Sequence, residues 1–315
     1  MKNHPSRKSG LAPYYEAMSS FIMPARDLLF ILVICIVWAG NFIAGATGMQ
    51  HFSPFLFMVL RFTLLLLLLL PFIRRPPAGQ WLRLISVCLL MGGLHFSLMF
   101  WALARAEDIS TVAIVQQTYI PMAVLLAIVL MREAVGWKTL AATGLAFLGV
   151  MIIGFDPLVL TQIDVLAITL ASALFQALGS IYQRGIRGVG VLSFQAWTAV
   201  IALPVLLAAT LLTEQGQLET LKTAQWQSWA SVAYSAVMAS LVGHGLFFYL
   251  VQRHPVSSVM PYLQLTPVLA VVFGVLIWGD RPGPRLLFGG ALVITGILFI
   301  TLRARQKSVG RKGLG

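Results

Sequence analysis

Charged residues are scarce in this sequence. Only 10% of its 315 residues are charged, whereas a soluble domain carries roughly 25%. The charges fall at intervals, and long apolar runs such as residues 64–71 lie between them. A bilayer core needs about 20 apolar residues per helix, while barrel strands alternate in polarity rather than run continuously. The pattern predicts an all-α integral membrane protein with many spans.

Several chemical signatures are also lacking. The only two cysteines, Cys35 and Cys88, lie inside apolar runs, so they form neither a disulfide framework nor a metal motif. The sequence has no HExxH pattern and no phosphate-binding loop, so we expect no metal, no cofactor and no ATP-driven step within this chain. No nucleophile has a histidine and an acid nearby in the sequence, which argues against an enzyme.

The apolar runs can be divided into ten candidate helices, separated by short connections rich in Pro, Gly and basic residues. Residues 1–26 and 304–315 are expected to form a polar N-terminal tail and a basic C-terminal tail. The ten helices are expected at 27–49, 53–73, 80–103, 108–131, 137–155, 163–183, 190–213, 226–250, 256–278 and 284–303.

The basic residues predict the orientation in the membrane. Of the 22 Lys and Arg residues, Arg61 lies inside a helix, and four lie in the loops of one side, namely Arg105, Lys222, Arg281 and Arg285. All the others lie on the side of the two termini. Lys and Arg concentrate in cytoplasmic loops, so both termini are predicted in the cytoplasm, with the protein in the cell inner membrane. The net charge of +12 therefore reflects orientation, and no nucleic-acid partner is expected.

The two halves of the chain, 27–155 and 163–303, resemble one another. FWALAR (100–105) aligns with FYLVQR (248–253), and IPMAVLLAIVLMRE (120–133) aligns with TPVLAVVFGVLIWGD (266–280). Each half holds five expected helices, and an odd number inverts the second copy in the membrane. Inverted repeats are typical of secondary transporters, which bind their substrate near the midplane between the halves.

The motifs WAGNF (38–42) and LRF (60–62), the proline of the fourth helix, and the acid followed by glycine around the fifth helix resemble the EamA family of the drug/metabolite transporter superfamily. The resemblance implies ten helices in two inverted five-helix repeats, and transport of small molecules, often export of amino acids or other metabolites. Two residues depart from the family pattern, Gln176 where Trp is frequent and Asp280 where Glu is usual.

Polar side chains at membrane depth are costly and mark candidate sites. The pair Gln116 and Gln117 lies near the midplane beside Pro121, which frees a backbone carbonyl. The pair could line a cavity or make an interhelical hydrogen bond. Arg61 could bind a carboxylate or phosphate, or it could bond carbonyls at helix ends or extend toward the surface. The candidate substrate-binding residues are Trp38, Asn41, Arg61, Trp101, Gln116, Gln117, Gln176, Tyr262 and Gln264.

Two histidines lie in corresponding helices of the two halves. His95 follows Gly92 in the third helix, and His244 lies between Gly243 and Gly245 in the eighth. Histidine titrates near neutral pH, so both are candidates for coupling transport to a proton gradient. The alternative is that each is simply a hydrogen-bonded residue of the interior.

These observations predict a secondary transporter that works by alternating access and exports a small polar metabolite, such as an amino acid or a derivative. Its partners would be that substrate, the lipid bilayer and a proton gradient, and it would be a monomer or a homodimer. An exporter or flippase of larger amphipathic cargo, such as a drug or a lipid-linked molecule, is an alternative. A membrane scaffold that transports nothing is another.

Overall fold

The computed structural model describes residues 23–132, 135–155, 161–183, 185–253, 259, 262–263 and 265–312. All regular elements in these ranges are helices. The first half contains α2 (Ala25–Gly48), α3 (Pro54–Leu69), η1 (Leu70–Phe72), α4 (Trp81–Cys88), η2 (Leu89–His95), α5 (Phe96–Arg105), α6 (Ile109–Gln116), α7 (Tyr119–Met131) and α8 (Trp137–Gly154).

The second half is also helical throughout the described residues. It contains α10 (Ile163–Gln183), α11 (Val191–Thr213), α12 (Gln217–Thr223), α13 (Trp226–Ala233), η3 (Tyr234–His244), α14 (Gly245–Arg253), α16 (Leu265–Phe273), η4 (Gly274–Trp278) and α17 (Pro284–Lys312). The sequence did not predict the short helix α12, which lies in the loop after α11.

Seven helical stretches are long and apolar enough to cross a membrane, and three shorter apolar helices lie at Trp137–Ile153, Leu265–Trp278 and Pro284–Ile300. The seven are Ala25–Gly48, Pro54–Phe72, Trp81–Arg105, Ile109–Leu130, Ile163–Gln183, Val191–Thr213 and Trp226–Phe247. Each coincides with a predicted helix to within a few residues. The all-helical membrane fold is thus confirmed, while the count of ten spans stays a prediction.

Two predicted boundaries differ from the structure. α17 continues to Lys312 instead of ending at 303, because the basic segment after 303 is free of proline and rich in Arg, Lys and Gln, which favour helix. The ninth helix was expected from 256, where most residues to 264 lie outside the described ranges. Glu133, one of the two acids that mark the repeat, also lies outside them.

The fourth predicted helix is broken near its middle. The amides of Gln117 and Thr118 bond to the carbonyls of Ile114 and Val115, each three residues earlier, at 3.0 Å. This tight turn separates α6 from α7. Pro121 is the physical cause that the sequence contains, because it has no amide proton for the carbonyl of Gln117. The break between α6 and α7 therefore falls at the pair Gln116 and Gln117.

The third and eighth predicted helices each contain a wider, π-helical segment. In the first half it is η2, which ends at His95, and in the second half it is η3, which ends at His244. π-Helical segments are rare in proteins, and those that occur often lie at functional sites. Both halves therefore depart from α-helical geometry at corresponding places and next to the histidines singled out in the sequence.

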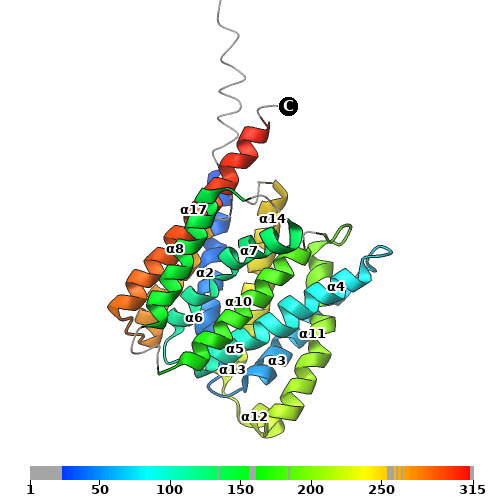
Figure 1. The fold of residues 1–315 in the computed structure, drawn as a ribbon. Coiled ribbons are helices and arrows are strands. Elements are labelled where there is room, and N and C mark those ends of the chain that lie inside the picture. The colour runs from blue at the N-terminus through cyan, green and yellow to red at the C-terminus, as the bar shows by residue number, and fades with distance from the viewer. Residues whose placement is uncertain are drawn as a thin grey trace, which may run out of the picture.

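The helices of the two halves are interleaved, so the halves do not form two separate bundles. α2 of the first half packs against α13, η3 and α16 of the second, and α10 of the second packs against α4, η2, α5, α6 and α7 of the first. α3 pairs with α11, and α8 pairs with α17; Figure 1 shows α8 and α17 side by side. The largest buried apolar cluster includes residues from both halves, so neither half encloses its own core.

Candidate functional site

Arg61, on α3, is buried in the middle of the bundle. The residue is 1% exposed. Its Nε and Nη2 donate to Ser240 Oγ at 3.3 and 2.9 Å. Its guanidinium carbon lies 4.6 Å from the ring centre of Phe96, where a cation is attracted to the face of the ring. Nη1 is buried and has no hydrogen-bond partner among the described residues. A buried cation with a free donor is costly. This nitrogen is therefore the clearest position in the interior for a hydrogen-bond acceptor.

Ser240 connects Arg61 to Asn41. Ser240 Oγ donates to the carbonyl of Ser235 at 3.0 Å, and Ser235 Oγ donates to Asn41 Oδ1 at 2.7 Å. All four residues are buried. We call Asn41, Arg61, Ser235 and Ser240 the arginine cluster. Its members come from α2, α3 and η3, so it joins the two halves.

Gln116 belongs to a second network, at the end of α6. Its Nε2 donates to Gln176 Oε1 at 2.8 Å. Ser172 Oγ lies 3.1 Å from Gln116 Oε1, 2.9 Å from the carbonyl of His95 and 2.9 Å from His95 Nδ1. A hydroxyl has one proton, so Ser172 donates to only one of these oxygens at a time. We call His95, Gln116, Ser172 and Gln176 the glutamine cluster. This network can rearrange without any helix moving.

The two clusters meet at Phe96, the first residue of α5. One face of its ring lies against Arg61, and its centre is 4.6 Å from the ring centre of His95. Both clusters also use a π-helical segment, because His95 ends η2 while Ser235 and Ser240 belong to η3. Phe96 thus contacts one predicted residue of each cluster, Arg61 and His95, while Asn41, Gln116 and Gln176 belong to the hydrogen-bond networks of these two residues.

Trp38 and His244 form a third contact, also between α2 and η3. Trp38 Nε1 donates to the carbonyl of Ala239 at 3.2 Å, and His244 Nδ1 lies 2.8 Å from the same oxygen. The two rings are 5.1 Å apart. Because a carbonyl only accepts hydrogen bonds, His244 must carry its proton on Nδ1 here. Both predicted residues are therefore held by one backbone oxygen of η3.

Three other predicted residues, Gln117, Trp101 and Tyr262, take part in none of these hydrogen-bond networks among the described residues. Gln117 is half-buried at the helix break, and its side chain makes no hydrogen bond to the described residues. Trp101 is 38% exposed and packs against Phe55, and Tyr262 is 44% exposed. Gln264 lies outside the described residues.

Sequence reasoning missed the three serines. Ser235 and Ser240 lie in an apolar helix with nothing in the sequence to distinguish them from other small residues that let helices approach. Ser172 could have been found, because it lies four residues before Gln176 and therefore on the same face of α10.

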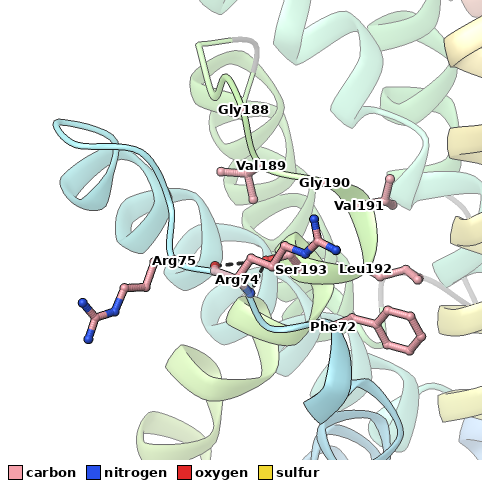
Figure 2. Close-up of a pocket in the computed structure, with 9 residues that line it drawn as sticks. All are labelled: Phe72, Arg74, Arg75, Gly188, Val189, Gly190, Val191, Leu192 and Ser193. Carbon is pink, nitrogen blue, oxygen red and sulfur yellow. Dashed lines mark hydrogen bonds between the residues drawn. The ribbon is translucent and has the colours of Figure 1, made fainter.

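A pocket of about 290 Å³ lies elsewhere, at the loop after η1 and the start of α11. Figure 2 shows it with the backbone of Arg74 bonded to Ser193, while the side chain of Arg75 points away. Its lining residues are Phe72, Arg74, Arg75, Gly188, Val189, Gly190, Val191, Leu192 and Ser193. None of the predicted site residues lines it.

Comparisons with known proteins follow the same two-part division. The sequence profile of the EamA-like transporter family matches the chain twice, at residues 26–155 and 163–302. A crystallised protein, 19% identical, has the same fold with a TM-score of 0.60 over 90% of this chain and 99% of its own.

Three similar proteins carry names that bear on function. A "probable amino-acid metabolite efflux pump" of Escherichia coli is 25% identical over 92% of this chain and its own entire length. Its namesake from Salmonella typhimurium is 26% identical over 92% of this chain and 99% of its own. A "probable terminal-alkyne amino-acid exporter" of Streptantibioticus cattleyicolor is 25% identical over 92% of this chain and 97% of its own.

Proposed function

The chain belongs to the EamA-like transporter family and is a multi-pass membrane protein, and on that premise we propose that it is a secondary active transporter rather than an enzyme. The proposed activity is export of a small polar metabolite, an amino acid or a derivative, by alternating access across the inner membrane. The names of the three relatives support the cargo class. The observation that carries the site is Nη1 of the buried Arg61, which has no hydrogen-bond partner among the described residues.

Arg61 attracts the acidic group of the cargo. Its Nε and Nη2 are engaged by Ser240, so the cargo oxygen bonds to the free Nη1. The cation is already desolvated by its burial, and a carboxylate there gains a charge-assisted hydrogen bond without further loss of water from the arginine. Neutral cargo would leave the charge uncompensated, which favours anionic and zwitterionic molecules.

The amides contact the polar groups of the cargo. Gln116 is now bonded to Gln176, so cargo that reaches Gln116 replaces this bond with one of its own. Gln117 is the more accessible of the pair, and its side chain has no hydrogen bond to the described residues that the cargo would have to replace. Asn41 uses its oxygen for Ser235 and keeps its amide nitrogen for the cargo. The other proposed contacts of the cargo are Trp38, Trp101, Gln176, Tyr262 and Gln264.

The proposed architecture is ten spans in two inverted five-helix repeats, with both termini in the cytoplasm. The two matches to one family profile support the repeat, as do the paired π-helical segments that end at His95 and His244. A proton gradient drives export in this proposal, with the two histidines as the coupling groups, since either can change its hydrogen bonds on gaining a proton.

The test is an untargeted metabolite profile of the medium. Cells making the unchanged protein are compared with cells making Gln116→Ala/Gln117→Ala at equal membrane abundance. The matched control is Gln225→Ala/Gln227→Ala, which removes two exposed amides in and before α13. The proposal expects one compound to be enriched in the medium by the unchanged protein and by the control, but not by the Gln116→Ala/Gln117→Ala variant.

Each other outcome rejects part of the proposal. Equal enrichment by all three proteins would keep export and reject the glutamines as site residues. Enrichment of a large amphipathic compound would favour the drug or lipid exporter. No change in the medium with any protein would reject export and leave uptake or a scaffold.

A further inference from the structure

Asp280 binds the start of a helix in the opposite half. Its Oδ1 accepts from the amide of Ile109 at 3.2 Å, and its Oδ2 accepts from the amide and the hydroxyl of Ser110 at 2.9 and 2.6 Å. The aspartate is buried. Its carboxylate therefore lies against the positive end of α6, where a negative charge is favoured.

Glu214 does the same for α3. It accepts from Ser53 Oγ at 2.5 Å and from the amides of Phe55 and Leu56 at 2.9 and 3.1 Å. Glu214 follows α11, so this carboxylate also comes from the second half. Both contacts lie at the end of the bundle that the loop charges predict to face the outside of the cell.

The two helices held in this way are the ones that carry the site. α6 carries Gln116 and α3 carries Arg61. Each begins with its backbone amides bound to a carboxylate that belongs to the other half. Movement of Asp280 and Glu214 away from these helix starts would break both sets of bonds and release the helices that carry both site residues.

The sequence builds the Asp280 contact with two glycines. Gly279 has φ +85, a left-handed conformation that glycine adopts without strain, and it turns the chain so that the Asp280 amide bonds to the carbonyl of Gly274 at 2.9 Å. A Cβ at Gly274 would lie 2.2 Å from Asp280 Oδ2 and 2.9 Å from Ser110 Oγ. Any larger residue at 274 would displace the carboxylate.

The start of α6 does not need Asp280 in order to form. Asp108 precedes it and accepts from the amide and hydroxyl of Thr111 at 2.6 and 2.9 Å, which is the ordinary N-cap of a helix. A second carboxylate at the same terminus, delivered from residue 280, therefore acts between the halves rather than within the helix.

We propose that Asp280 and Glu214 are positioning residues that latch the outer gate of the transporter, and that this structure has the outer gate closed. The inference rests on the proposed function. The latches hold α6 and α3, and with them Gln116 and Arg61, in the arrangement closed to the outside. Outward opening requires the carboxylates of the second half to leave these helix starts.

The first test measures access to α6 from outside and needs no knowledge of the cargo. The reporter is Ala113→Cys, whose position is buried in this structure, in a background with Cys35→Ala and Cys88→Ala. Right-side-out vesicles are treated with a membrane-impermeant maleimide. Asp280→Asn, alone and with Glu214→Gln, should raise the labelling rate about tenfold, as a minor open state becomes the major one.

Asp164→Asn is the matched control, because it removes one negative charge at the same end. Asp164 forms an exposed ion pair with Arg105 at 2.7 Å and binds no helix start in the other half. If the latch variants are labelled no faster than this control, the latch is refuted. If no protein is labelled at all, including the one with native carboxylates, the solvated pathway and the proposed function are refuted together.

A second test remains informative even if Asp280→Asn does not fold. It leaves Asp280 unchanged: Ser53→Cys and Glu214→Cys, in the background without Cys35 and Cys88, are joined by a reducible thiol cross-linker, since the side chains of Ser53 and Glu214 are in contact. Export of the metabolite identified in the medium should stop on cross-linking and resume on reduction. A purely structural role predicts no loss, because the cross-link preserves the closed arrangement. Full export by the cross-linked protein would overturn the gate.

Discussion

At the scale of single residues, replacement of Arg61 distinguishes a binding role from a structural role. It is a buried cation whose partners are a serine hydroxyl and aromatic faces. A buried cation is costly, and even complete buried ion pairs can often be replaced by apolar side chains of similar volume with no loss of stability, or with a gain of about 1–4 kcal/mol. We predict that Arg61→Met melts at the same temperature or higher, while export falls to background. The measurements are a thermal melt in detergent and the export assay.

Arg61→Lys is the control for charge alone. An ammonium cannot reproduce the planar fork that bonds Ser240 through two nitrogens, so partial export is expected. A melting temperature that drops by many degrees in Arg61→Met would instead assign the arginine to the scaffold.

The two neighbouring glutamines should behave differently. Gln116 has two side-chain partners, Ser172 and Gln176, and interhelical hydrogen bonds in membranes average about 0.6 kcal/mol each. Gln116→Ala should therefore lower the free energy of unfolding by about 1 kcal/mol. Gln117→Ala should leave it unchanged and weaken only cargo affinity. Reversible unfolding in mixed micelles and concentration-dependent export would separate the two, and equal stability losses would contradict the structure.

At the scale of elements, the α8–α17 pair depends on the absence of side chains. A Cβ at Gly149 would lie 2.5 Å from the carbonyl oxygen of Gly289, and backbone cannot move aside as a flexible side chain can. We predict that Gly149→Ala destabilises the protein by about 1–3 kcal/mol, the usual cost of overpacking. Thermal melting of the purified protein is the measurement.

Gly144→Ala, on the same helix, is the matched control. Nothing lies within 4 Å of its added Cβ, and alanine favours helix over glycine by about 1 kcal/mol. This variant should melt at the same temperature or higher. Should both variants lower the melting temperature equally, helix packing would not be the reason.

At the scale of the whole molecule, the loop charges predict the orientation in the membrane. We predict that a fluorescent protein fused after residue 315 matures in the cytoplasm, and that one inserted in the loop before α12 does not. An alkaline phosphatase at the same two positions should show the opposite pattern. Fluorescence at both positions would contradict ten spans.

Much of this architecture could be predicted from the sequence, because it depends on local composition. The long apolar runs required helices, the basic loops predicted their direction, and Pro121 marked the place where α6 and α7 separate. The motifs around Trp38 and Arg61 led to the family that the profile match confirms. The polar residues at membrane depth were found because lipid makes them expensive.

Only the tertiary structure decided which polar residues act together. Ser240 and Ser235 meet Arg61 and Asn41 across more than 170 residues of chain, and Asp280 meets Ser110 from 170 residues away. Trp101, which was grouped with the site in the sequence, lies on the exposed side of α5. Composition determines whether a segment is helical and buried in lipid, because that depends on its own side chains. Hydrogen-bond partners depend on which helices pack, and that is settled only when the two halves interlock.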